Sequence, residues 1–357
     1  MRFEIFLAFI SLLTKAAELQ SSGSPAEDKR RQVASETPQL EAALEKALEA
    51  GYRHIDTALV YENEATIGKV LKKWMDSGKV KREDLFIVTK LPPGGNHPSL
   101  VRKFFMQSLT DLQLEYLDLY LVHTPWAFKY TEGNLHPTNE DGEFLIDPNT
   151  DHIAIWREME KLADEGLAKA IGLSNFNERQ IKRVHDNSRV KPANLQVEVH
   201  AYFQQRPLID FCRQHNITVT AYSPLGSRGL GSFMKKRELP DLHNNAVILE
   251  MSKKYEKTPA QILLRHIIQR GIAAIPKSTN ADRIKQNIDI FDFEISPEDV
   301  EKIDNLDQGE NGRVCDFKYR SPIAPSTNKI EGLYSSMAMS TFYQYPWYAG
   351  NKKIALR

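Results

Sequence analysis

From Glu41 onward, short apolar runs alternate with longer amphipathic stretches. Runs rich in Val, Ile and Leu are typical of strands that are buried on both faces. Strands that alternate with helices predict a parallel sheet built from strand–helix units. The predicted strands are Tyr52–Asp56, Leu85–Lys90, Leu117–His123, Ala168–Ser174, Ala193–Glu198, Thr218–Ser223 and Ala273–Lys277. Predicted helices include Gln39–Ala50, Glu64–Met75, Ser99–Leu112, Ile153–Glu165, Glu178–His185, Pro207–His215 and Pro259–Gln269.

The motifs and the number of strands distinguish between the possible parallel folds. No Gly-x-Gly-x-x-Gly motif follows a predicted strand, so the doubly wound dinucleotide-binding fold is not supported. A closed (β/α)8 barrel, the TIM barrel, needs one strand more than the seven predicted here. We therefore expect an α/β barrel over residues 39–307 whose first strand is missing or replaced, followed by a substrate loop and tail over residues 308–357.

Residues 1–38 have a different character from the rest of the chain. Arg2 precedes the apolar run Phe3–Leu13, and small residues follow at Ala16 and Ala17. This order is typical of a secretory signal peptide, and the run is too short to span a membrane. We expect a cleaved signal peptide over residues 1–16 and a polar linker over residues 17–38, in a secreted or secretory-pathway protein. In the alternative, Phe3–Leu13 is retained as a substitute strand and the protein is cytoplasmic.

Charge and cysteine content exclude several classes of function. The 47 Lys and Arg residues balance the 47 Asp and Glu residues, so no net charge attracts nucleic acid or an anionic membrane. Cys212 and Cys315 form neither a disulfide framework nor a metal-binding spacing, and we predict no metal site. The expected partner is therefore a small molecule.

Polar side chains stand at the ends of successive predicted strands. Asp56, Lys90 and His123 end the first three, and Tyr61 lies in the loop after the first. The carboxyl ends of barrel strands meet at one mouth, so these side chains should converge there. A Tyr can donate a proton when a Lys ammonium favours its phenolate and a carboxylate holds the Lys, while a neutral His orients a carbonyl oxygen. The four residues supply these roles.

The motifs around these residues resemble the aldo-keto reductase family, in particular its aldose and aldehyde reductases. Asp56 precedes Tyr61 by five residues, Lys90 follows Tyr61 by 29, and His123 follows Lys90 by 33, which are the spacings of that family. The resemblance covers about three quarters of the chain. Further matching stretches are Gly51–Ala58, Ile171–Phe176, Ala221–Gly226 and Ile275–Ser278.

The resemblance implies an NADPH-dependent oxidoreductase that reduces an aldehyde or a ketone to an alcohol. Tyr61 would donate the proton, Lys90 and Asp56 would tune it, and His123 would align the substrate. By the same analogy, the residues that hold the cofactor would be Ser174, Asn175, Gln196 and Tyr222 at the nicotinamide, Ser223, Leu225 and Ser227 at the pyrophosphate, and Lys277, Ser278, Arg283, Gln286 and Asn287 at the adenosine end.

Two departures from the family pattern concern the cofactor. Family members open with a strand that carries a Gly-rich turn and a Thr that contacts the cofactor, and residues 1–38 contain nothing similar. An acidic residue that often helps to hold the cofactor is replaced by Arg228-Gly229. In favour of NADPH over NADH, Lys277 and Arg283 each offer a full positive charge to a 2′-phosphate.

Aromatic residues in the predicted loops bear on the substrate. Trp126 lies three residues after His123, in the loop Thr124–Thr150. We expect both residues to contact an apolar carbonyl compound, and we expect the chain to be a monomer. Two alternatives stay open: a non-catalytic NADPH-binding or structural relative, and a truncated product that lacks the first barrel strand.

Overall fold

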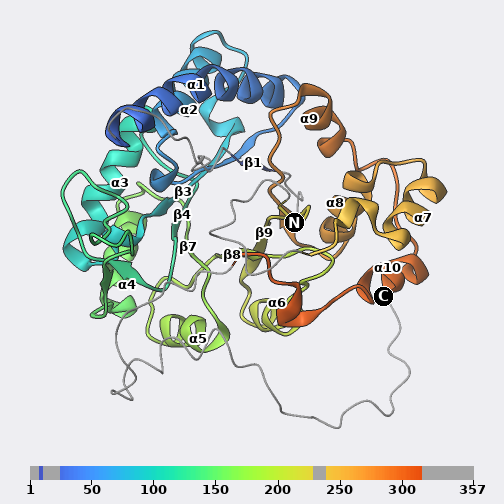
Figure 1. The fold of residues 1–357 in the computed structure, drawn as a ribbon. Coiled ribbons are helices and arrows are strands. Elements are labelled where there is room, and N and C mark those ends of the chain that lie inside the picture. The colour runs from blue at the N-terminus through green and yellow to red at the C-terminus, as the bar shows by residue number, and fades with distance from the viewer. Residues whose placement is uncertain (1–7, 11–24, 228–238, 316–357) are drawn as a thin grey trace. The chain divides into compact units, whose positions relative to one another are not determined.

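The computed structural model describes residues 8–10, 25–227 and 239–315 of the 357-residue chain. In this part, one sheet has the strand order β1-β2-β3-β4-β7-β8-β9-β10. Every neighbouring pair in it is parallel, and helices surround the sheet (Figure 1). The fold is a (β/α)8 barrel, as the sequence predicts. Its strands are β1 (Ala8–Ile10), β2 (His54–Asp56), β3 (Phe86–Leu91), β4 (Leu119–Val122), β7 (Ile171–Ser174), β8 (Asn194–Glu198), β9 (Thr218–Tyr222) and β10 (Ala273–Ala274).

Apart from the start of α1, the predicted helices begin and end within one residue of the predicted positions, and α7, α9 and α10 were not predicted. Polar side chains cap several of them: Asn177 and Gln180 form a reciprocal capping box at one N-terminus, and Thr258 and Gln261 form another. The short hairpin of β5 (Ala127–Phe128) and β6 (Ile146–Asp147) was not predicted. The helices are α1 (Pro25–Glu49), α2 (Glu64–Asp76), α3 (Pro98–Leu112), α4 (His152–Asp164), α5 (Glu178–Asp186), α6 (Arg206–Gln214), α7 (Ala246–Tyr255), α8 (Pro259–Gln269), α9 (Ala281–Ile288) and α10 (Pro297–Asp304).

Strand β1 occupies the position of the strand that the sequence leaves in doubt. Ala8, Phe9 and Ile10 pair in parallel with His54, Ile55 and Asp56 of β2. The first strand is thus replaced rather than missing, and the replacement comes from the run that the favoured interpretation assigns to a signal peptide. For Ala8–Ile10 the structure has the arrangement of the alternative interpretation, in which the run forms a substitute strand. The rest of Phe3–Leu13 lies outside the described residues.

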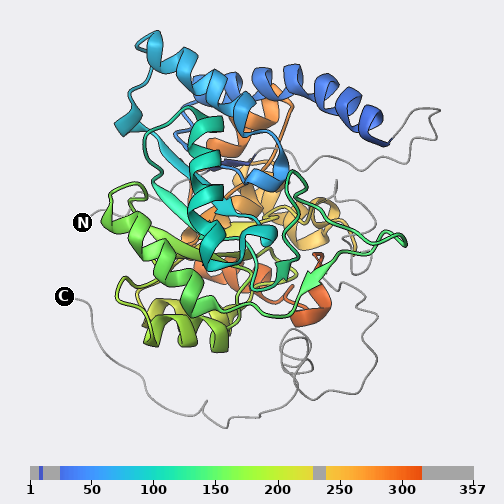
Figure 2. The ribbon, with the colours of Figure 1, turned by 90° about the vertical axis from the view of Figure 1, so that its left-hand side faces the viewer.

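Helix α1 corrects the prediction of a polar linker for residues 25–38, while residues 17–24 lie outside the described part of the chain. The helix begins at Pro25 rather than at Gln39. Residues 25–36 are polar, but most of them are Ala, Glu, Lys, Arg and Gln, which have high helix propensity. Figure 2 shows α1 lying beside α2. Among the described residues, no helix is both long and apolar enough to cross a membrane.

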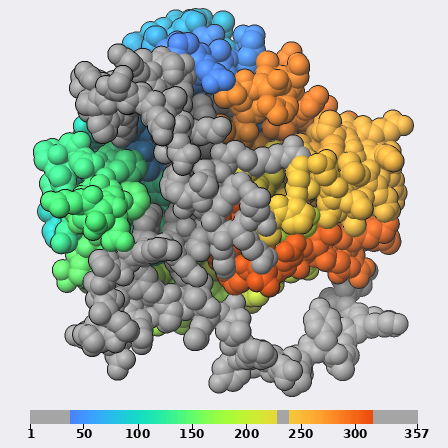
Figure 3. Space-filling view, viewed as in Figure 1, coloured from blue at the N-terminus to red at the C-terminus, as the bar shows by residue number. Residues whose placement is uncertain are grey.

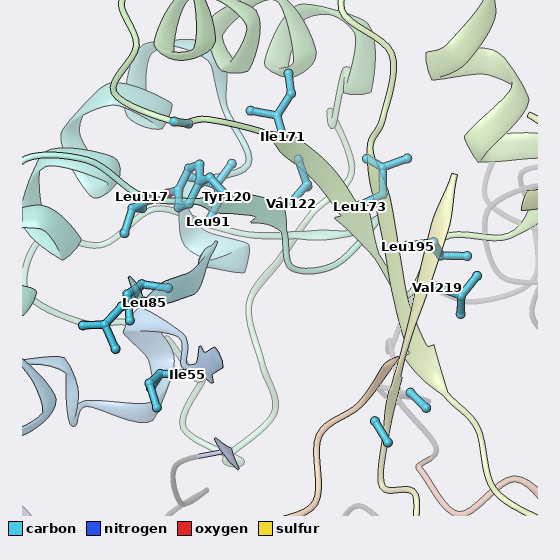
Figure 4. Close-up of a cluster of buried hydrophobic side chains, with 14 of the residues drawn as sticks. Ile55, Leu85, Leu91, Leu117, Tyr120, Val122, Ile171, Leu173, Leu195 and Val219 are labelled. Atoms are coloured by element: carbon cyan, nitrogen blue, oxygen red, sulfur yellow. The ribbon is translucent and has the colours of Figure 1, made fainter. Parts of the chain in front are cut away.

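Alternation along the strands creates two hydrophobic layers. Tyr120 and Val122 of β4 belong to the large cluster that includes residues of the surrounding helices (Figure 4). Leu119 and Leu121 of the same strand belong instead to a small cluster with Val88 of β3. Successive side chains point to opposite faces of a strand, so the second cluster fills the barrel interior.

The outer layer closes between the two ends of the sheet. Helix α1 packs against α9, and the two segments adjoin in blue and orange in Figure 3. Tyr52, which precedes β2, donates a hydrogen bond from its hydroxyl to the backbone oxygen of Ile284 in α9, at 3.1 Å. Burial of Tyr52 raises the pKa of its phenol, so the group stays a donor.

Removal of residues 1–16 should destabilise the barrel. The backbone groups of β2 that face β1 would lose their partners, at about 0.5–1.5 kcal/mol for each hydrogen bond. A barrel of this size loses roughly 2 °C of melting temperature for each kcal/mol. We expect thermal denaturation to occur several degrees lower than in the full chain. A chain that starts at residue 5 keeps β1 and serves as the control. Equal melting temperatures for all three chains would show that β1 adds no stability.

Candidate active site

The pleat of the strands directs the predicted site residues into the barrel interior. Ile55, Ile87 and Leu195 contact the helices as part of the outer cluster. Asp56 and Gln196 are the next residues along their strands, and Lys90 lies three positions after Ile87 on β3. Because side chains alternate, these three point away from the helices and into the barrel. All three are buried near the carboxyl ends of their strands, where barrel enzymes hold their active sites.

A buried ion pair lies at the centre of the site. Lys90 Nζ is 2.5 Å from Asp56 Oδ1, and neither side chain has any solvent-exposed area. Lys90 also donates to the backbone oxygen of Thr57 at 2.7 Å. Burial acts to lower the pKa of Lys90, but the negative charges of Asp56 and of an ionised Tyr61 outweigh it and raise that pKa. Lys90 is therefore an ammonium ion at neutral pH.

Gln196 donates a hydrogen bond to the second oxygen of the Asp56 carboxylate. Its Nε2 donates to Asp56 Oδ2 at 2.6 Å. The bond crosses the barrel from β8 to β2, over a separation of 140 residues. Each oxygen of Asp56 thus has a donor, as a buried carboxylate requires.

Tyr61 and His123 lie beside the ion pair. Tyr61 ends a short 3-10 turn, Leu59–Tyr61, and Glu62 follows in the left-handed conformation with φ of 54°. The Tyr61 and His123 rings meet edge to face, with centroids 5.8 Å apart. Lys90 Nζ is 5.3 Å from the Tyr61 ring centroid. The structure thus brings together all four residues of the predicted catalytic set.

Burial keeps both rings neutral. It raises the pKa of Tyr61, and Lys90 opposes this effect without overcoming it. The expected influence of Lys90 on Tyr61 is therefore present but is the smaller one. Burial, followed by repulsion from Lys90, holds the pKa of His123 well below its usual value. His123 Nδ1 is buried and has no hydrogen-bond partner. An uncharged His123 next to a protonated Tyr61 can orient and protonate a carbonyl oxygen.

The residues predicted at the nicotinamide form a network that joins this cluster. Asn175, with a positive φ of 64°, directly follows β7. Its amide nitrogen donates to the backbone oxygen of His123 at 3.0 Å and to Ser174 Oγ at 3.2 Å. Tyr222, at the end of β9, donates from its hydroxyl to Asn175 Oδ1 at 2.9 Å. Ser174 pairs directly with Gln196 across β7 and β8.

The residues predicted at the pyrophosphate follow β9. Ser223 and Ser227 both have a positive φ, of 53° and 48°. The Ser223 hydroxyl is 3.9 Å from the Cys315 sulfur. Leu225 is half-buried against the hydrophobic core. Ser227 is the last described residue of this loop, so Arg228-Gly229, which replaces the expected acidic residue, lies outside the described part.

The residues predicted at the adenosine end lie in α9 and in the segment just before it. Asn280 caps this helix by accepting from the backbone amide of Arg283 at 2.9 Å. Lys277 and Arg283 are exposed, as is Gln286. Ser278 and Asn287 are buried, with 8% and 4% of their surface exposed. Lys277 thus precedes this short helix, and Arg283 lies in its first turn. In the described part of the chain, no group of His, Cys, Asp and Glu is arranged to hold a metal ion.

Trp126 is fixed by a residue that the sequence analysis missed. Asn96, in the turn after β3, donates from its Nδ2 to the backbone oxygen of Trp126 at 2.7 Å and to that of Thr124 at 2.8 Å. The Trp126 side chain is half-buried. No motif marks Asn96, because its acceptors are backbone oxygens 28 and 30 residues away.

Glu198 was also missed, although a signal existed. It lies two residues after Gln196 on β8, and alternation places the two on the same face of the strand. The side chain is fully buried and accepts hydrogen bonds from His200 and from two backbone amides near the C-terminal end of the described chain. A charged residue in an apolar strand that already carries a predicted site residue could have identified it.

Comparisons with known proteins agree with this arrangement. The sequence profile of the aldo/keto reductase family matches residues 27–308. Aldo-keto reductase family 1 member A1 of Mus musculus is 47% identical over 275 residues, which cover 77% of this chain and 83% of that protein. Dihydrodiol dehydrogenase 3 of Bos taurus is 44% identical over 262 residues, which cover 73% of this chain and 80% of that protein.

A solved structure shows the same likeness. The aldose reductase of Schistosoma japonicum is 39% identical, with a TM-score of 0.72 over 85% of this chain and 88% of that one. The family profile matches well over half of the chain, and the relatives share far more sequence than fold similarity alone requires. The chain therefore belongs to the aldo-keto reductase family.

Proposed function

We propose that this protein uses NADPH to reduce an aldehyde or a ketone to an alcohol, with Tyr61 as the proton donor. Membership of the aldo-keto reductase family makes it an oxidoreductase that acts on carbonyl compounds. The observation that carries the finer proposal is the buried Lys90–Asp56 pair directly beside Tyr61. An intact cluster of Asp56, Tyr61, Lys90 and His123 argues against a non-catalytic relative, so we favour the enzyme.

The residues at the mouth fit a nicotinamide dinucleotide. The half-buried amide of Asn175, the buried amide of Gln196 and the hydroxyl of Ser174 match the hydrogen-bonding groups of a carboxamide. The Tyr222 ring offers a face for the nicotinamide. When bound, NADPH would supply the hydride. Ser223, Leu225 and Ser227 would border its pyrophosphate.

The chain's own residues would handle the proton. His123, held neutral, would donate a hydrogen bond to the carbonyl oxygen and align it. Tyr61 would give its proton to the same oxygen, and the Lys90 ammonium would stabilise the phenolate that remains. Asp56 would keep Lys90 charged and in place.

The substrate is proposed to be an apolar carbonyl compound. Trp126 lies three residues after His123, and Asn96 holds its backbone by a hydrogen bond. The half-buried Trp126 ring would contact the substrate next to the reacting oxygen. Large aromatic surfaces favour apolar ligands. We also propose that the enzyme acts as a monomer, since the cluster that supports the chemistry is assembled within one chain.

We propose in addition that residues 8–10 stay with the folded enzyme, which favours the cytoplasmic alternative over a secreted protein. The support is the pairing of β1 with β2, which cleavage near Ala17 would remove. N-terminal sequencing of the protein from its native source tests this. We expect a chain that begins at residue 1 or 2. A chain that begins near Ala17 would restore the interpretation as a signal peptide.

Replacement of Tyr61 by Phe should abolish most of the activity. The variant loses only the hydroxyl, so turnover should fall by roughly a hundredfold or more while NADPH affinity is unchanged. Steady-state kinetics with an aldehyde and quenching of protein fluorescence by NADPH measure the two effects. Turnover within a few-fold of the wild type would remove Tyr61 from the role of proton donor.

The double variant Lys277→Glu, Arg283→Glu should lose its preference for NADPH. Like charge would replace attraction at the 2′-phosphate, so the Kd of NADPH should rise by roughly tenfold or more while that of NADH changes little. Fluorescence titration with both cofactors measures this. Lys285→Glu, an exposed cation on the same helix, is the matched control. If the preference is unchanged, the phosphate binds elsewhere.

A further inference from the structure

Glu198 is a buried charge outside the proposed proton-transfer cluster. It ends β8, and its side chain has no exposed surface. Oε1 accepts from the backbone amide of Val314 at 2.7 Å, and Oε2 accepts from that of Cys315 at 2.8 Å. His200 Nε2 lies 2.8 Å from Oε1 and serves as the third donor. A carboxylate is stable in such surroundings only when its oxygens are satisfied in this way.

The partners of Glu198 belong to one stretch of chain, which we call the rim segment (residues 308–315). Its amide at Gln308 donates to the backbone oxygen of Tyr202 at 2.9 Å. Gly312 packs so closely that a Cβ there would lie 1.7 Å from the same oxygen. The Arg313 guanidinium covers the Phe203 ring at 4.4 Å from its centroid. The rim segment is therefore seated on the turn that follows β8, and Glu198 holds its far end.

This end of the rim segment lies beside the proposed chemistry. The Cys315 sulfur is 3.9 Å from the Ser223 hydroxyl, next to Tyr222. A negative charge on the Cys315 sulfur would raise the pKa of Tyr61, so the two groups lie near each other. Val314 and Cys315 are almost completely buried, with 4% and 3% of their surface exposed. A shift of the rim segment would therefore change the surroundings of Ser223 and Tyr61.

Strand β8 carries both the residue that contacts the ion pair and the residue that holds the rim segment. Gln196 donates to Asp56 of the ion pair, and Glu198, two residues later on the same face, accepts from the rim segment. The position of the rim segment relative to Lys90 is thus fixed through one strand of the sheet. Strands are stiff because both edges are hydrogen-bonded, as β8 is to β7 and β9.

We propose that Glu198 is a positioning residue that fastens the rim segment across the mouth of the barrel and thereby selects which carbonyl compounds reach Tyr61. The proposal rests on the proposed carbonyl reduction for its second half only. Its first half concerns the attachment of residues 314–315 and is independent of any activity.

Thiol labelling tests the attachment directly. The chain has two cysteines, and both are buried. Glu198→Gln keeps the size of the side chain, but its amide nitrogen cannot accept from a backbone amide. We expect maleimide to modify Cys315 roughly tenfold faster or more in this variant. The reason is that the charged hydrogen bonds that hold residues 314–315 against Glu198 are lost, so Cys315 becomes exposed more often. Mass spectrometry locates the modified residue, and Cys212 in α6 should stay unmodified as the internal control.

Glu310→Gln is the matched control variant. It removes an ion pair between Glu310 and Arg313 within the same rim segment, at 2.8 Å and partly exposed. Exposed pairs contribute little to stability, so the labelling rate of Cys315 should stay near that of the wild type. Equal rates in the wild type and in Glu198→Gln would overturn the proposal, as would an equal increase in Glu310→Gln.

Amide exchange in the wild-type protein provides a test that needs no variant. The amides of Val314 and Cys315 should exchange with solvent at least about a hundredfold more slowly than in an unstructured peptide, because both donate to a buried carboxylate. If Glu198→Gln does not fold, this measurement decides. Unprotected amides at both positions would overturn the attachment.

Kinetics test the effect on substrate choice. In Glu198→Gln, kcat/KM for nitrobenzaldehyde should fall roughly fivefold or more relative to kcat/KM for propanal, mainly through a higher KM. The reason is that the aromatic aldehyde is large enough to contact the displaced residues 314–315, whereas propanal is not. The Kd of NADPH should be unchanged. An unchanged ratio between the two aldehydes would overturn the role in selection. If the wild type reduces no carbonyl compound, the proposed function fails, while the labelling result still decides the attachment.

Discussion

The ion pair of Asp56 and Lys90 is the interaction on which the site depends. It holds two full charges without solvent contact, which is costly unless each has further partners. Thr57 and Gln196 supply them, so the pair connects β2, β3 and β8 inside the barrel. Removal of one member of such a pair leaves an uncompensated charge, at about 3–5 kcal/mol. The same contacts that keep Lys90 charged therefore also fix three strands relative to each other.

Burial and charge act in opposite directions on the neighbouring rings. Burial keeps Tyr61 protonated and His123 uncharged, which is the state that can donate a proton and align a carbonyl oxygen. Lys90 favours the phenolate that would remain after the transfer. An interaction that becomes stronger as the reaction proceeds lowers the barrier more than one that only holds the reactants. The ion pair thus connects the stability of the barrel with the proposed chemistry.

Strand β8 connects the ion pair to the rim segment. Gln196 contacts the ion pair, and Glu198 contacts residues 314–315 on the same face. At the other end of the sheet, β1 completes the barrel with residues from the N-terminal apolar run. Both segments are remote in sequence from the strands that they join. Their places in the fold come from backbone hydrogen bonds.

The sequence by itself determined the alternating strands and helices, and with them the carboxyl ends at which Asp56, Lys90 and His123 meet. Local apolar patterns encode such elements, and the parallel fold brings their ends together. Only the tertiary structure decided that Ala8–Ile10 forms a strand and that Asn96 and Glu198 hold distant loops. The physical reason is that their partners are mainly backbone groups. Every residue has a backbone oxygen and nearly every one an amide, so even where the side chain itself stands out, as Glu198 does, no residue type in the sequence marks its partner.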